Sequence, residues 1–129
     1  GVLVARHENE IGGTTDVAQR PDFAARKRRQ VIDGEAFEGW FTEDFTLAEL
    51  KTLRARERLP GLRGTAHDGR YEIATLDEII ALASEHAART GRRIGLIPEI
   101  KHPSHFRRIG LPMEERLLQA LAGHAYTRE

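Results

Sequence analysis

The chain has 129 residues, of which 40% are hydrophobic and 31% charged, and its 20 basic residues balance 20 acidic ones. This composition is typical of a globular domain, and the lack of net charge gives no general reason to expect a nucleic acid or an anionic membrane as a partner. The absence of cysteine excludes a disulfide framework, a thiolate zinc site and a cysteine nucleophile. No apolar run reaches the roughly 20 residues of a transmembrane helix, so we expect no transmembrane segment.

The first predicted element is a strand at residues 2–5, a short apolar run that ends at Arg6 and His7. Unbroken apolar runs of this length are typical of parallel strands, which are covered on both faces. Because the run starts without a preceding loop or cap, we interpret the chain as a segment that begins inside a domain.

The stretch 8–74 is far longer than an ordinary connection between a strand and a helix. It contains a turn-rich segment at 12–16, weak helix or irregular structure at 16–29, and a possible hairpin or extended loop at 32–41. Connections of this length in compact domains are structured insertions or functional lids. We therefore expect an inserted, lid-like region within 8–74.

Two conspicuous groups in this stretch have ordinary structural explanations. Four consecutive basic residues at 26–29 have the charge of a nucleic-acid contact, but no aromatic residues are interleaved with them. We interpret them as a solvated surface and expect no nucleic acid partner. We interpret Trp40 and Phe41 as core or lid anchors.

Two capping boxes mark the starts of helices. In each, a threonine, Thr46 or Thr75, is followed three residues later by glutamate and then by apolar residues at helical spacing. The predicted helices cover about 47–56 and 76–90. Gly91 is suited to the left-handed position that follows a helix.

A second strand and a third helix complete the pattern. The apolar run 93–99 predicts a strand that ends at Glu99, and a third helix is expected to start at Pro112 and to end before Gly123. Strand, long excursion, helix, strand and helix form a βαβα order, which favours an α/β fold with parallel strands.

Polar side chains with acid–base or metal-binding chemistry end both predicted strands. His7 follows the first run and Glu99 ends the second. Because ligand sites in parallel α/β folds lie at the carboxyl ends of the strands, both residues are candidate site residues. Lys101 lies two positions after Glu99, and side chains two apart in an extended chain point to the same side. A carboxylate and an ammonium that face one pocket suit a divalent cation and a phosphate.

These residues also have ordinary explanations. His7 can be a polar strand end, and the glutamate and lysine can form a surface ion pair that contributes about 0–1 kcal/mol. Two further histidines, His102 and His105, have the spacing of a zinc pair on a helix. Pro103 lies between them, and we therefore expect no helix and no zinc pair there.

Four separated segments resemble one known family in its own order: residues 3–11, 14–18, 40–51 and 97–103. They are similar to the larger, mostly exported bacterial glycerophosphodiester phosphodiesterases. The resemblance implies a fragment of a TIM (β/α)8 barrel, with parallel strands and a long insertion after the first strand. It also implies hydrolysis of a small glycerophosphodiester, such as glycerophosphocholine, to glycerol 3-phosphate and an alcohol, with Ca²⁺ or Mg²⁺ as cofactor.

The resemblance assigns roles to the candidate residues. His7 matches the second of two catalytic histidines and would act as general acid or base, Glu99 matches a metal ligand, and Lys101 matches a lysine near the substrate phosphate. The residue after His7 is Glu8, where many members have aspartate. The family's first catalytic histidine and its Glu-x-Asp pair of metal ligands lie upstream of the residues that match Gly1. We therefore expect activity in the full-length protein and none in this chain alone.

Two alternatives stay open from the sequence. A related barrel phospholipase of the sphingomyelinase D type uses similar histidine and metal chemistry, and a non-catalytic domain would bind glycerophosphodiesters without hydrolysing them. The resemblance implies a periplasmic or secreted location. The sequence does not determine the alcohol group, the choice of metal or the oligomeric state.

Overall fold

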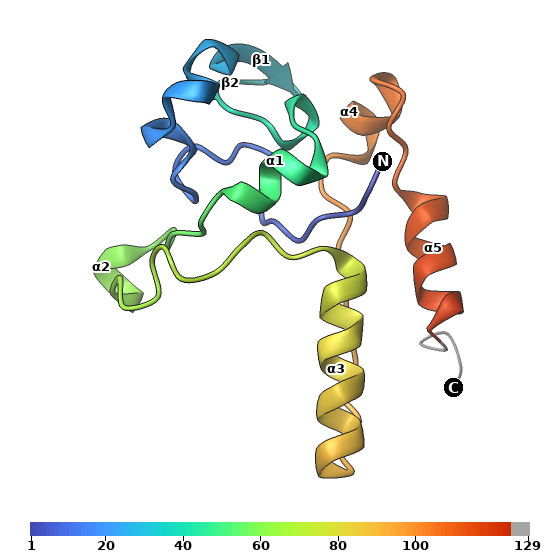
Figure 1. The fold of residues 1–129 in the computed structure, drawn as a ribbon. Helices are drawn as coiled ribbons and strands as arrows, with labels where there is room; N and C mark the ends of the chain where they lie inside the picture. The colour runs from blue at the N-terminus through green and yellow to red at the C-terminus, as the bar shows by residue number, and fades with distance from the viewer. Residues whose placement is uncertain (125–129) are drawn as a thin grey trace. The chain divides into compact units, whose positions relative to one another are not determined.

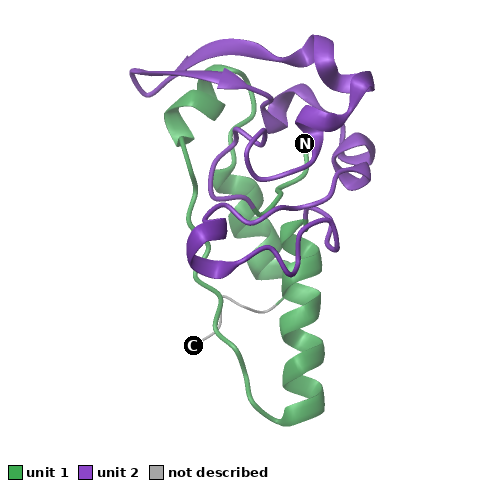
Figure 2. Cartoon of the chain, turned by 90° about the vertical axis from the view of Figure 1, so that its left-hand side faces the viewer, with its two compact units in different colours: residues 1–5, 74–129 green, residues 6–73 purple. Residues whose placement is uncertain are grey.

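The computed structural model describes residues 1–124 and divides the chain into two compact units (Figure 2). Unit 1 comprises residues 1–5 and the chain from Ala74 onward, and unit 2 comprises residues 6–73. Helices and one two-stranded sheet make up the regular structure of residues 1–124 (Figure 1). No helix in this part of the chain is long and apolar enough to cross a membrane.

Unit 2 is built from short elements joined by long connections. In chain order they are the 3-10 helices η1 (Val17–Gln19) and η2 (Pro21–Arg26), strands β1 (Arg28–Ile32) and β2 (Glu35–Gly39), the 3-10 helix η3 (Thr42–Asp44), and helices α1 (Leu47–Thr52) and α2 (Pro60–Arg63). The expected weak helix within 16–29 is confirmed as η1 and η2. Helix α1 starts at the expected capping box but ends four residues before the predicted end.

The hairpin of unit 2 turns at Asp33 and Gly34. Both have positive φ angles, 51° and 91°, which is the backbone that a two-residue turn between antiparallel strands requires. Arg28 pairs with Gly39 at the open end of the hairpin and Ile32 with Glu35 at the turn. The hairpin therefore begins before the segment 32–41 in which it was expected, because the Asp-Gly pair sets the turn.

The core of unit 2 gathers one or two apolar side chains from each segment. Its buried members are Ile11, Val17, Phe23, Ile32, Phe41, Leu50, Leu53 and Ile73. Phe41 is fully buried, which confirms its interpretation as a core residue. The indole Nε1 of Trp40 donates to the carbonyl oxygen of Phe23 at 2.7 Å, so this residue fixes η2 against the strand that precedes Phe41.

The four basic residues at 26–29 were interpreted as a solvated surface, and this prediction was wrong for two of them, Arg26 and Arg28. Arg26 binds the carboxylate of Glu49 at 2.5 and 3.0 Å, and Arg28 binds that of Asp44 at 2.7 and 3.0 Å. The guanidinium of Arg26 also lies 5.1 Å from the ring centroid of Phe23. These pairs join η2 and β1 to the segment around α1, which the charge pattern alone did not indicate.

Unit 1 contains the helices α3 (Leu76–Thr90), α4 (Pro103–Arg108) and α5 (Glu114–Gly123). The capping box at Thr75 and the left-handed Gly91, with φ of 70°, confirm the predicted ends of α3. Residues 1–5 pair with its start, since the Leu76 amide donates to the Leu3 carbonyl at 3.0 Å. Ile80 and Ala83 of α3 are buried.

The parallel sheet expected from the two apolar runs is not present among residues 1–124. Val4 makes one isolated antiparallel bridge with Thr75, and residues 92–101 adopt no regular structure. Ile97 is 98% exposed. An apolar run becomes a buried parallel strand only where neighbouring strands and helices cover it, and the described residues supply no such neighbours.

Two predictions about proline were also wrong. Helix α5 begins at Glu114 rather than Pro112, and Gly123 is its last residue rather than the residue beyond it. Pro103 does not prevent a helix but starts α4, because the first helical position needs no amide donor. His105 is buried on α4, whereas His102 precedes the helix with a left-handed φ of 51°.

Candidate functional site

His7 lies in unit 2, just after the first apolar run, and its side chain is 53% exposed. Two groups of opposite charge contact the same ring nitrogen. The Nδ1 atom lies 2.7 Å from Oε1 of Glu8 and 3.2 Å from Nη1 of Arg58. Neither of these two residues contacts the Nε2 atom of the ring through the atoms named.

Arg6 supports the segment that carries His7. Its Nη2 donates to the carbonyl oxygen of Thr14 at 3.1 Å and also to the Thr14 hydroxyl. Burial lowers the pKa of the Arg6 guanidinium, while the charge of Glu10 acts in the opposite direction. The Nε atom is buried and has no hydrogen-bond partner among residues 1–124. These contacts fix the backbone before His7 to the turn at Thr14.

The glycine-rich turn is held from the other side by Glu10. Its Oε1 accepts hydrogen bonds from the Gly12 amide at 2.7 Å and from the Trp40 amide at 3.2 Å. A β-carbon at Gly39 would lie 2.0 Å from the same carboxylate oxygen. Glu10 therefore has a structural role, because its carboxylate binds backbone amides. The carboxylate that contacts the ring of His7 is that of Glu8.

Glu99 and Lys101 lie in unit 1, on the irregular segment between α3 and α4. Their side chains meet, with Nζ of Lys101 3.1 Å from Oε1 of Glu99. The expectation that the two point to the same side is confirmed. Glu99 is 72% exposed and Lys101 31% exposed, so the carboxylate is the more accessible of the two. The catalytic role of His7, the metal role of Glu99 and the phosphate role of Lys101 stay predictions.

The described residues do not by themselves form a complete site for a hard cation. Within residues 1–124, no three histidine, aspartate or glutamate side chains come together as a metal cluster. Ca²⁺ takes about six to eight oxygen ligands, and Mg²⁺ about six. Of the residues that the sequence singled out, Glu99 has a carboxylate of the right chemistry for such an ion, and it is 72% exposed.

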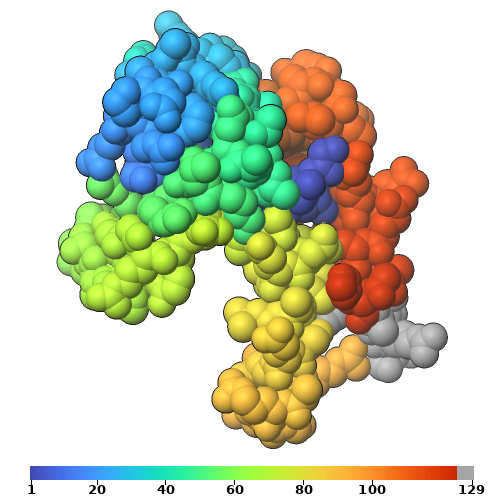
Figure 3. Space-filling model, viewed as in Figure 1, coloured from blue at the N-terminus to red at the C-terminus, as the bar shows by residue number. Residues whose placement is uncertain are grey.

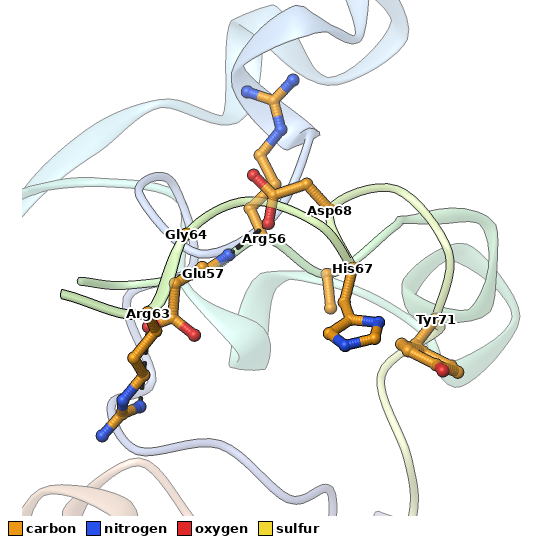
Figure 4. Close-up of a pocket in the computed structure, with 8 residues that line it drawn as sticks. Arg56, Glu57, Arg63, Gly64, His67, Asp68 and Tyr71 are labelled. Atoms are coloured by element: carbon orange, nitrogen blue, oxygen red, sulfur yellow. Dashed lines mark hydrogen bonds and ion pairs between the residues drawn. The ribbon is translucent and has the colours of Figure 1, made fainter. Parts of the chain in front are cut away.

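Unit 2 has a hollow of about 370 Å³ around the segment that follows α1 (Figure 4). Its lining residues are Ala55, Arg56, Glu57, Arg63, Gly64, His67, Asp68 and Tyr71. The rings of His67 and Tyr71 lie 5.9 Å apart on one side, and Arg63 lies 3.5 Å from Glu57 on the other. Figure 3 shows this segment, in yellow-green, at the molecular surface. Two arginines and two carboxylates in the lining balance each other, so the hollow does not select a ligand of one charge.

The comparisons with known proteins cover nearly the whole chain. A sequence model described as the Glycerophosphoryl diester phosphodiesterase family matches residues 1–126. The chain belongs to this family. It is 37% identical over 131 residues to the glycerophosphodiester phosphodiesterase GDPD6 of Arabidopsis thaliana. This alignment covers 98% of the chain and 34% of the Arabidopsis protein. It is 27% identical over 139 residues to a glycerophosphodiester phosphodiesterase of Haemophilus influenzae, and this alignment covers 100% of the chain and 36% of the bacterial protein.

This phosphodiesterase family assignment confirms the resemblance carried by the four sequence segments. The chain spans about a third of the length of these relatives. One relative is a plant protein and the other a bacterial one, so the narrower bacterial type expected from the sequence stays a prediction.

The structure adds Arg58 to the neighbourhood of His7, and the sequence pattern did not predict it. Arg58 lies 51 positions after the histidine, in the stretch between α1 and α2. No local spacing rule connects residues so far apart. Glu8 was visible in the sequence only as a departure from the aspartate that many family members carry.

Proposed function

We propose that the full-length protein hydrolyses glycerophosphodiesters. Water would add across one phosphorus–oxygen bond of the diester to give glycerol 3-phosphate and a free alcohol. The observation that carries the proposal is the match of residues 1–126 to the family, joined to the chemistry of the residues that the sequence had singled out. A half-exposed imidazole and an accessible carboxylate beside an ammonium are the side chains that such a reaction uses.

Each residue has one part in the proposal. His7 exchanges a proton with the attacking or leaving oxygen, and Lys101 binds a non-bridging phosphate oxygen. Glu99 supplies one oxygen ligand to Ca²⁺ or Mg²⁺, which when bound would neutralise charge on the phosphate. Since the described residues hold too few ligands for such an ion, the rest would come from other parts of the longer protein. We therefore propose that this chain alone is inactive.

We also propose that the chain forms part of a TIM barrel in the full-length protein. The runs 2–5 and 93–99 would then be parallel strands, and the region within 8–74 would be the insertion between the first strand and its helix. In favour of this, Ile94 and Ile97 are exposed in unit 1, as expected of strand residues whose covering elements lie elsewhere. Unit 2, residues 6–73, has its own core and nearly the bounds proposed for the insertion. A periplasmic or secreted location is part of the proposal and rests on the family resemblance.

The test is hydrolysis of glycerophosphocholine by the full-length protein with and without Ca²⁺ or Mg²⁺. His7→Gln is expected to lower kcat by about 10²- to 10⁴-fold, which is the usual contribution of a general acid or base. Glu99→Gln is expected to raise the metal concentration needed for half-maximal rate. His86→Gln and Glu85→Gln, both on α3, are the matched controls and should leave turnover unchanged.

Two outcomes would redirect the proposal. Turnover of a choline-containing sphingolipid but of no glycerophosphodiester would favour the phospholipase of the sphingomyelinase D type. A wild-type protein that binds glycerophosphocholine and hydrolyses no diester with any metal would favour a non-catalytic binding domain.

A further inference from the structure

Nδ1 of His7 is contacted by two side chains that make opposite demands on it. Glu8 lies 2.7 Å away and, as a carboxylate, only accepts hydrogen bonds. Arg58 lies 3.2 Å away and, as a guanidinium, only donates them. A neutral imidazole nitrogen is either a donor or an acceptor, so the two contacts cannot both be hydrogen bonds in one state.

The geometry favours the carboxylate. The distance to Glu8 is 0.5 Å shorter than that to Arg58 (2.7 against 3.2 Å), and it falls in the range of charge-assisted hydrogen bonds. In this state Nδ1 carries the proton and Nε2 carries the lone pair. A carboxylate that holds one nitrogen of a histidine in this way fixes both the tautomer and the orientation of the ring.

Arg58 is then next to the ring without being able to donate to it. Its guanidinium is exposed on the connection between α1 and α2, beside a nitrogen that is already a donor. A planar guanidinium can donate two parallel hydrogen bonds to phosphate oxygens. A protonated ring nitrogen, in contrast, accepts no hydrogen bond from it. A phosphate bound by Arg58 would lie within reach of the imidazole of His7.

We propose that Glu8 is a positioning residue that keeps His7 in the Nδ1-protonated tautomer, and that Arg58 binds a phosphate oxygen of the ligand beside it. The part concerning Arg58 rests on the proposed function; the part concerning Glu8 does not. With Nε2 unprotonated in the resting state, His7 is set up to accept a proton rather than to donate one. For the proposed hydrolysis, this tautomer assigns the histidine as the base, a choice that the sequence left open.

The tautomer is tested directly in the intact protein with ¹⁵N-labelled histidine. Two-bond ¹H–¹⁵N correlations distinguish the protonated from the unprotonated ring nitrogen, at a pH where the ring shifts no longer change. His7→Gln identifies the His7 signals by their loss. We expect the Nδ1-protonated form to predominate in the wild type and the Nε2-protonated form in Glu8→Ala.

Glu8→Gln is the second variant, because it keeps the side-chain size while weakening the acceptor. It should shift the His7 tautomer in the same direction as Glu8→Ala, and to a smaller extent. Glu35→Ala, at an exposed position of strand β2, is the control and should leave the His7 signals unchanged. If wild type and both Glu8 variants show the same tautomer ratio, the role of Glu8 is wrong.

The phosphate contact is tested with glycerol 3-phosphate as the probe, titrated into the protein with and without Ca²⁺. Arg58→Met should weaken binding at least tenfold and Arg58→Lys less, because lysine keeps the charge and loses the paired donors. Arg70→Met, at an exposed arginine of the same unit, should have no effect. No binding by wild type, or equal affinity in wild type and Arg58→Met, would overturn the role of Arg58. Binding that depends on Arg58 in a protein without turnover would refute the proposed hydrolysis and retain this phosphate contact.

Discussion

The carboxylate of Glu49 offers a measurable test of how unit 2 is held together. It accepts hydrogen bonds from Arg26 at 2.5 and 3.0 Å and from the Thr46 amide at 2.8 Å. The pKa of Glu49 is lowered from an ordinary 4.5 to about 2. The hydrogen bonds from Arg26 are the largest cause of this shift, and the hydrogen bond from the Thr46 amide is the next. The pKa of this one group therefore reports on the contact between η2 and α1.

Replacing Arg26 by methionine removes its hydrogen bonds to Glu49 and keeps an apolar side chain near Phe23. We expect the Glu49 pKa to rise well above 2 and to stay below 4.5, because the Thr46 amide still donates. Thr46→Ala is the matched comparison. It removes the hydroxyl and keeps the amide, so the rise should be smaller.

The assay is a ¹³C NMR titration of the side-chain carboxyl, from neutral pH to about pH 2, below the usual range of carboxylates. A wild-type Glu49 that titrates near 4.5, or a larger rise in Thr46→Ala than in Arg26→Met, would refute the reasoning. The same pKa has a consequence for stability. Because the folded value is depressed, the contribution of Glu49 is complete above pH 4.5 and is lost as the pH falls toward about 2.

Three further predictions concern the stability of the two units, measured as the free energy of unfolding in urea. Thr75→Ala removes the side-chain cap of α3 and should cost about 1 kcal/mol, whereas an unchanged value would mean that the cap contributes nothing. Phe41→Ala empties a fully buried position and should cost about 3–5 kcal/mol, with a smaller loss for the partly exposed Phe37→Ala as control. Gly91→Ala places a β-carbon at a φ of 70° and should cost about 1 kcal/mol; a gain in stability would contradict the left-handed end of α3.

Features set by neighbours in the chain were predictable from the sequence. The capping boxes at Thr46 and Thr75 act over three residues, and both are confirmed. The approach of Lys101 to Glu99 follows from the alternation of an extended chain over two residues, and it too is confirmed. The family was recognisable because four separated segments carried its pattern in order.

Features that join distant parts of the chain were decided only by the tertiary structure. Arg58 meets His7 across 51 positions, and Arg26 meets Glu49 across 23, and no periodicity encodes such pairs. The two apolar runs read as buried strands, yet Ile97 is almost fully exposed, because an extended run is buried only by the elements that pack against it. The capped starts of α1 and α3, the family and the identity of the candidate residues were therefore predictable from the residues alone. Tertiary structure decided which charges meet, which apolar residues are buried and what surrounds the histidine, because these depend on contacts that form only when the chain folds back on itself.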